Sequence, residues 1–105
     1  MMRDLGKMMK QVQRLQQDMA RLQDEMKAER VEATAGGGVV RAVANLHGEI
    51  QEIVIDPSVV DPADVATLQD LILAAVTEVQ RTARAQADER VKALTGGLPL
   101  PPGLM

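Results

Sequence analysis

Apolar residues recur at helical spacing over the first 26 positions of the chain. They alternate at intervals of three and four for three heptads, at Leu5, Met8, Val12, Leu15, Met19, Leu22 and Met26. This spacing is typical of a coiled-coil-like seam, and the residues between are mostly good helix formers. The pattern predicts one helix of about 25 residues, roughly 37 Å long at 1.5 Å per residue. Such a helix overhangs a small sheet, so part of it should project as an arm.

The apolar period changes to two between residues 31 and 57, which predicts a three-stranded antiparallel sheet. The three glycines 36–38 permit positive φ and join the first strand to the second, and His47 lies in the next turn. Pro57 ends the third strand, because proline has no N–H for the ladder and restricts the residue before it. The predicted strands are residues 31–35, 39–46 and 50–55.

Alternation along the second and third predicted strands places apolar residues on both faces of the sheet. A sheet with one face in water should alternate more cleanly, so we expect a cover on each face. In a chain this short, the expected cover of the second face is a second copy, with Val39, Val43 and Val54 at the dimer interface. The first face carries Val40, Ala42, Ala44, Leu46, Ile53 and Ile55.

A second helix is predicted beyond the sheet. Asp61 is its expected N-cap and Pro62 its first helical residue. Its broad apolar face suits the covering of a sheet, then thins, so the second half should project and be sparsely buried. Gly96 and Gly97 stop the helix. Residues 98–105 are expected to form a mobile Pro-rich tail.

The predicted order is therefore helix, three strands, helix, an α+β arrangement in one domain of residues 1–97. A chain of 105 residues has no room for a second domain. Because Phe, Tyr, Trp and Cys are absent, the core must be built from smaller apolar side chains, and dimerisation would compensate. The sequence lacks a signal peptide's apolar core and a membrane span of ~20 apolar residues. The cytoplasm is the expected compartment, and no membrane partner is expected.

Charge is divided unevenly along the chain. The formal net charge is −3, but residues 1–30 carry seven basic and five acidic residues, a net +2, and the remainder carries −5. Five basic residues fall along one stripe of the first predicted helix, opposite the apolar seam. On its own, such a stripe is more often a solvated face that keeps a helix soluble. The residues are Arg3, Lys7, Lys10, Arg14 and Arg21.

Catalytic chemistry finds no support in the sequence. His47 is the only histidine, there is no cysteine, and no carboxylate pair has the spacing of metal ligands. The glycines 36–38 are not followed by Lys and Ser or Thr, so they are a poor phosphate-binding loop. We therefore expect no enzyme activity, cofactor, metal or small-molecule substrate.

Five short motifs, in order and over nearly the whole chain, resemble those of the YbaB/EbfC family of bacterial nucleoid-associated proteins. The resemblance implies an α-β-β-β-α fold, a tight homodimer with protruding helices, and DNA binding in the bacterial nucleoid. The motifs are Lys7-Met8-Met9-Lys10-Gln11, Gly36-Gly37-Gly38-Val39-Val40, Ile53-Val54-Ile55-Asp56-Pro57, Leu68-Gln69-Asp70-Leu71-Ile72 and Leu100-Pro101-Pro102-Gly103.

Together, the resemblance and the basic stripe predict that Lys7, Lys10 and Arg14 bind the phosphate backbone of duplex DNA, with Arg3 and Arg21 contributing less. The alternative contact residues lie on the mixed charged face of the second predicted helix, at Arg81, Arg84, Arg90 and Lys92. A two-fold axis would present two such arms. Sequence preference should be weak, and the lack of aromatic residues disfavours single strands. Four glutamines, at positions 11, 13, 16 and 17, are an alternative means of reaching base edges, although glutamine is ordinary on a solvated helix. The alternative function is a coiled-coil interaction or chaperone-like protein whose helices grip protein partners.

Overall fold

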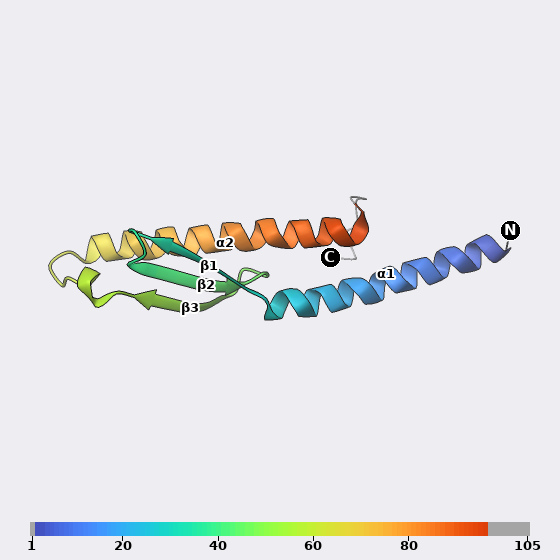
Figure 1. Cartoon of the computed structure of the whole chain (residues 1–105), viewed down its shortest axis with the longest axis horizontal. Helices are drawn as coiled ribbons and strands as arrows, with labels where there is room; N and C mark the ends of the chain where they lie inside the picture. The colour runs from blue at the N-terminus through green and yellow to red at the C-terminus, as the bar shows by residue number, and fades with distance from the viewer. Residues whose placement is uncertain (1, 97–105) are drawn as a thin grey trace.

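A computed structural model describes residues 2–96, and its elements follow the predicted order (Figure 1). The α+β class and the α-β-β-β-α order are confirmed. The predicted tail, residues 98–105, lies outside the described residues. The elements are α1 (Met2–Ala28), β1 (Arg30–Ala35), β2 (Val40–Asn45), β3 (Ile50–Ile55), a short 3-10 helix η1 (Pro57–Val59) and α2 (Val65–Thr95).

The sheet is antiparallel, in the order β1-β2-β3. Val40 pairs with Ala35 on one side and with Ile55 on the other, which fixes the register. The turn between β1 and β2 contains three glycines with positive φ. At Gly36, a glycine is required both by the positive φ and by the lack of space for a side chain. A Cβ there would lie 2.8 Å from the side chains of Leu71 and Val39, so the turn fits against α2 only without a side chain.

The hydrophobic core lies between α2 and one face of β1 and β2. The predicted core face of the second strand is confirmed, since its four residues are among the buried set. Met19, Leu22 and Met26 close the core where α1 meets the end of the sheet. The buried residues from the sheet and α2 are Val31, Val40, Ala42, Ala44, Leu46, Ala75, Val79 and Ala83.

One strand of the sheet is left without a helical cover. α2 packs on β1 and β2 but makes few contacts with β3. Ile53 pairs with the buried Ala42 and so faces the same side of the sheet, yet Ile50 and Ile53 are each 37% exposed. A single helix is about 10 Å across and two strands span about the same width, which is why the third strand is not covered.

The second face of the sheet carries its own cover of charged side chains. Arg30 pairs with Glu52 at 3.2 Å, and Arg41 pairs with Glu32 at 2.6 Å and with Glu52 at 3.5 Å. Val43 lies between Glu32 and Glu52 in the register and is only 4% exposed. Long charged side chains bury apolar surface along their stems, so Val43 is covered within the chain.

Val39 does not lie where strand alternation placed it. It falls in the turn before β2 and packs against the hydrophobic core beside α2, so its predicted position on the second face was wrong. A residue outside the ladder does not follow its alternation. Val54 does lie on the second face, opposite Arg41, and is 39% exposed.

α2 begins three residues later than predicted. Its N-cap is Asp64, whose carboxylate accepts bonds from the Thr67 N–H at 3.3 Å and the Thr67 hydroxyl at 2.6 Å. These bonds lower the pKa of Asp64. Asp61 instead closes a turn by accepting from the Ala63 N–H at 2.9 Å. Both aspartates suit a cap, but the turn around Pro62 displaces the helix start. The predicted end is confirmed, with Gly96 at φ 65° as the C-cap.

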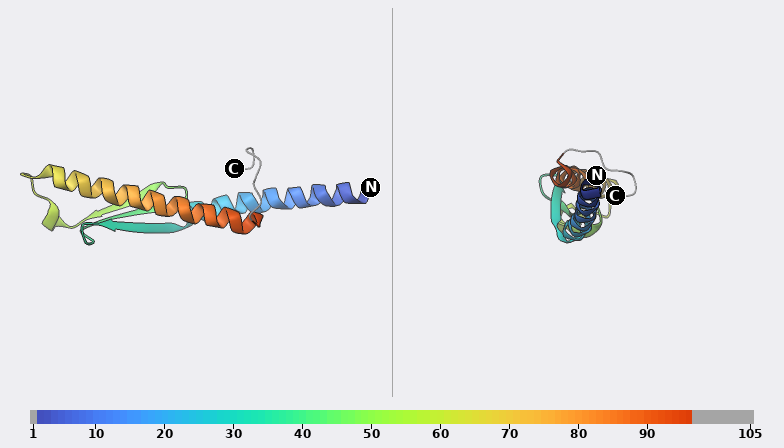
Figure 2. Two further views of the ribbon diagram at one scale, coloured as in Figure 1. Left: turned by 90° about the horizontal axis from the view of Figure 1, so that it is seen from above. Right: turned by 90° about the vertical axis from the view of Figure 1, so that its right-hand side faces the viewer.

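The molecule is strongly elongated, measuring 74 × 20 × 19 Å. Figures 1 and 2 show the first half of α1 extending beyond every other element, so the predicted projecting arm is confirmed. The end of α2 also passes the sheet, but it lies beside α1 and its Ala83 is fully buried. Among residues 80–95 Ala83 alone is buried, so the second half of α2 is sparsely buried, as predicted.

Candidate nucleic-acid interface

The apolar seam of α1 is buried at one end of the helix and exposed at the other. Met19 and Met26 are 4% and 3% exposed within the core. Toward the N-terminus no other element covers the same stripe within the described residues, and Met8 is 61% exposed and Val12 51% exposed. Leu5 and Met9 are similarly exposed, and the four side chains with Gln13 line a shallow apolar hollow. The arm therefore presents an apolar stripe that nothing covers within the described residues.

The basic stripe lies on the opposite side of α1. Lys7, Lys10 and Arg14 are exposed and form no ion pair within residues 2–96. Arg21 pairs with Asp18 at 3.1 Å, so it is less available to an anion. The side chain of Arg3 lies outside the described part of the structure. The predicted stripe thus contains three adjacent cations free of protein carboxylates.

Two of the three arginines in α2 are held by carboxylates. Arg81 pairs with Glu78 at 3.0 Å on its own helix. Arg90 donates to Glu29 and, at 3.2 Å, to Glu25, and the bond to Glu29 contributes most to raising its pKa. These bonds tie the end of α2 to the end of α1. Arg90 is therefore part of the structure rather than an open anion contact.

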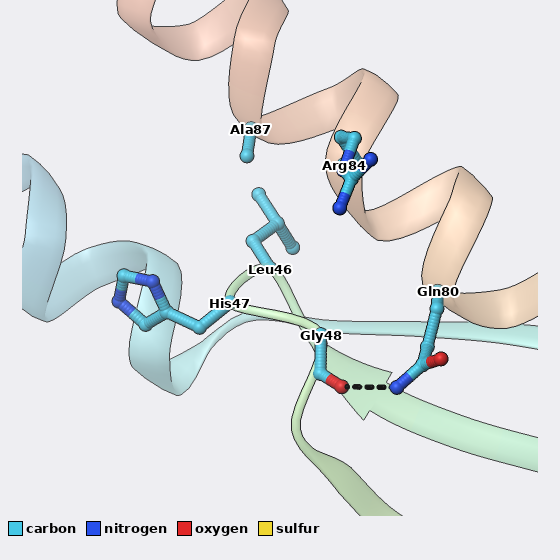
Figure 3. A pocket seen from close by; sticks show the side chains of 6 residues that line it. All are labelled: Leu46, His47, Gly48, Gln80, Arg84 and Ala87. Atoms are coloured by element: carbon cyan, nitrogen blue, oxygen red, sulfur yellow. Dashed lines mark hydrogen bonds between the residues drawn. The ribbon is translucent and has the colours of Figure 1, made fainter.

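Arg84, the remaining arginine of α2, stands beside an open hollow at the β2–β3 turn (Figure 3). The hollow measures ≈ 370 Å³. The Gln80 side-chain amide donates to the Gly48 carbonyl at 3.1 Å and so joins α2 to the turn. Within residues 2–96, Arg84 has no carboxylate at ion-pair distance. The lining residues are Leu46, His47, Gly48, Gln80, Arg84 and Ala87.

The β2–β3 turn is organised by Asn45, which is 2% exposed. Its side-chain carbonyl accepts from the N–H groups of His47 and Glu49, at 3.0 and 3.1 Å, and its amide donates to the Glu49 carboxylate at 2.7 Å. His47 Nε2 lies 3.1 Å from the Gln23 carbonyl of α1. His47 is thus a turn residue, as predicted.

Sequence reasoning missed this hollow because it joins residues more than 30 positions apart. The sequence placed Arg84 among four alternative contact residues of the second predicted helix, but a charge on one helix does not indicate its neighbour in the fold. Within residues 2–96, no cluster of acidic or histidine side chains is suited to a metal ion. Neither helix of that same segment has the length and apolarity to cross a membrane.

Residues 1–98 match the model of the YbaB/EbfC DNA-binding family. The chain is 51% identical over 98 residues to a nucleoid-associated protein of Pelotomaculum thermopropionicum, a match that covers 93% of each chain. It is also 50% identical over 101 residues to a nucleoid-associated protein of Acetivibrio thermocellus, covering 96% of this chain and 89% of that one.

The fold also matches a solved structure. An uncharacterized protein from Helicobacter pylori superimposes with a TM-score of 0.73 over 88% of this chain and 94% of the other. The two sequences are 20% identical. At that identity, the likeness supports the arrangement of helices and strands alone.

Proposed function

Since the chain belongs to the YbaB/EbfC DNA-binding family, we propose that it binds duplex DNA through the basic stripe of α1. The observation that carries this proposal is the set of three exposed cations, Lys7, Lys10 and Arg14, on the projecting half of the helix. No carboxylate within residues 2–96 pairs with them. Cations that are not already paired are the ones that can replace counterions on a phosphate backbone.

The binding is largely independent of DNA sequence. Lysine and arginine side chains on an exposed helix contact phosphates, which position a protein but carry no base information. The glutamines at positions 11, 13, 16 and 17 are exposed on the arm, but the structure gives them no orienting partner. Bidentate readout of a base requires a side chain held in place.

The protein acts as a homodimer. The arm exposes Leu5, Met8, Met9 and Val12, and the sheet exposes Ile50, Ile53 and Val54. A second copy that covers these surfaces turns the basic stripe outward, because the stripe lies opposite the seam. Of the three valines predicted at the interface, Val54 offers the most apolar surface, since Val43 is buried and Val39 is partly buried within the chain.

We also place the protein in the cytoplasm, on the bacterial nucleoid. Relatives from several bacteria that share about half of its residues are named nucleoid-associated proteins. The net charge of −3 does not oppose this, because the cations gather on one arm and the acidic residues lie elsewhere.

A second candidate function is the gripping of protein partners by the helices. The exposed methionines and leucine of the arm favour it, because flexible, Met-rich surfaces suit varied apolar partners. The two functions differ in their dependence on salt. Salt weakens cation–phosphate binding steeply, whereas apolar contacts persist.

The test is a fluorescence-anisotropy titration of a short labelled duplex at several salt concentrations. Three phosphate contacts per chain from α1, six per dimer, should contribute roughly −5 to the slope of log K against log salt. The double variant Lys10→Glu/Arg14→Glu should flatten the slope and weaken binding to all sequences alike. The variant Lys27→Glu/Lys92→Glu carries the same change in net charge outside the stripe and should retain most of the affinity. Equal losses in the two variants would contradict the assignment to the basic stripe of α1.

A further inference from the structure

We propose that the hollow between the β2–β3 turn and α2 is a second phosphate site, where Arg84 holds a phosphodiester group of the DNA backbone. This inference rests on the proposed DNA binding and adds a contact on the body of the molecule. The hollow is lined by three residues of the turn region and three of α2, namely Leu46, His47, Gly48, Gln80, Arg84 and Ala87 (Figure 3).

The first observation is the state of the Arg84 guanidinium. The arginines before and after it on α2 are committed, Arg81 to Glu78 and Arg90 to Glu25 and Glu29. Arg84 is exposed and has no such partner within residues 2–96. A guanidinium presents five donors in a planar fork that matches two phosphate oxygens, so Arg84 is the arginine of α2 able to take a phosphate.

The second observation is the shape around Arg84. Besides the hollow of ≈ 370 Å³, a second one of ≈ 260 Å³ is lined by Thr77, Gln80, Arg81 and Arg84. Arg84 and Gln80 line both hollows, so the Arg84 side chain borders open space in each. An extended polymer with a phosphate at its middle fits this arrangement better than a compact anion does.

The third observation concerns the neighbouring polar groups. The Gln80 side-chain amide donates a hydrogen bond to the Gly48 carbonyl oxygen. Without this bond, that oxygen would repel an anion in the hollow. Glu49, the acidic residue of the turn, is bonded to buried Asn45. The walls also include Leu46 and Ala87, and none of the six residues that line the hollow is acidic.

The experiment compares the full chain with Arg84→Gln and a charge-matched control, Lys92→Gln, on the same helix but outside both hollows. In the first arm, inorganic phosphate is titrated while NMR follows the Arg84 side-chain N–H and the Gly48 amide. We expect both signals to shift in the parent and in Lys92→Gln. In Arg84→Gln, the Gly48 shift should be lost.

In the second arm, duplex affinity is measured against salt. Loss of one phosphate contact should lower the magnitude of the slope by about 0.9 per chain, equivalent to about fivefold weaker binding per chain near 0.15 M salt. Lys92→Gln should stay within twofold of the parent, and Arg84→Lys should recover part of the affinity. This pattern, with phosphate-dependent shifts, supports the site.

Three other results overturn the proposal. If Arg84→Gln binds duplex like the parent and phosphate shifts neither signal, there is no phosphate site. If phosphate shifts the signals but duplex affinity is unchanged, the hollow takes a free phosphate and not the DNA backbone. If the parent fails to bind duplex, the proposed function fails as well. If Lys10→Glu/Arg14→Glu weakens duplex binding and Arg84→Gln does not, the proposed function stands and only the second site is removed.

Discussion

At the scale of single residues, Met26 and Met8 occupy the same apolar stripe in opposite environments. Met26 is 3% exposed and packs in the core, whereas Met8 is 61% exposed on the arm. Met26→Ala should therefore cost about 2–5 kcal/mol of unfolding free energy through the cavity it leaves. Met8→Ala should cost under about 0.5 kcal/mol within one chain.

Urea denaturation checks this pair of variants. If two chains bury Met8 between them, its cost should instead grow with protein concentration, because the folded state is then linked to association. If both variants lose the same unfolding free energy at every protein concentration, Met26 and Met8 cannot differ in burial as described.

Asp64 should make the stability of α2 depend on pH. Its bonds to Thr67 lower its pKa below the ordinary value of 3.8. A carboxylate with a lowered pKa stabilises the fold fully above its unfolded pKa, and this contribution is lost as pH falls through the folded value. Between pH 6 and 2, the melting temperature of the parent should therefore fall more than that of Asp64→Ala.

A control variant, Asp61→Ala, should lower the melting temperature at pH 7 less than Asp64→Ala does, because Asp61 closes a turn and does not cap the helix. Thermal melts by circular dichroism measure both effects. A larger loss in Asp61→Ala would restore Asp61 as the functional cap.

Residue-level prediction from the sequence was accurate where the pattern is local. The core face of β2 follows from alternation, since every second residue of a strand faces one side. It failed at Val43, which was expected to need a second copy to cover it. Val43 is instead buried within the chain beside Arg30, Arg41 and two glutamates. Those cross-strand contacts depend on the register of three strands, which the alternation of one strand does not contain.

At the scale of elements, the helices were the best-predicted parts. The heptad spacing and the capping glycine are local signals, and α1 and the end of α2 follow them. The start of α2 was missed because two aspartates three residues apart offer equivalent caps. The exposure of β3 was also missed, since the width that one helix covers is a property of packing.

The segment 98–105 provides a test of the predicted domain boundary. The sequence predicts that this segment lies outside the domain, and α2 is already capped at Gly96. Deleting residues 98–105 should therefore leave the melting temperature nearly unchanged. Calorimetry of the truncated and full chains measures this, and a fall of several degrees would show that the tail packs on the domain.

At the scale of the whole molecule, the shape explains why the candidate site was only partly predictable. The radius of gyration is 19.8 Å, whereas a compact domain of this length would have about 13 Å. The basic stripe of α1 was found from the sequence because it lies within one helix. The hollow at Arg84 required the β2–β3 turn and α2 to be brought together, which no local pattern indicates.

The same elongated shape argues for an obligate dimer. An arm that exposes four large apolar side chains to water loses the burial that stabilises small domains, and a core without aromatic residues has little stability to spare. Sedimentation at micromolar concentration should therefore show a species of twice the 11.3 kDa chain mass, with no stable folded monomer.

The variant Val12→Glu tests where the two copies meet. Val12 is 51% exposed, so within one chain a glutamate there is solvated and should change stability by less than about 0.5 kcal/mol. Between two chains the same charge would be buried without a partner and would dissociate the dimer. Gln17→Glu, which adds the same charge on the far side of the helix, should leave the mass unchanged. A folded, monodisperse 11.3 kDa parent would refute the dimer, whereas an unchanged mass for Val12→Glu would move the interface from the arm to β3.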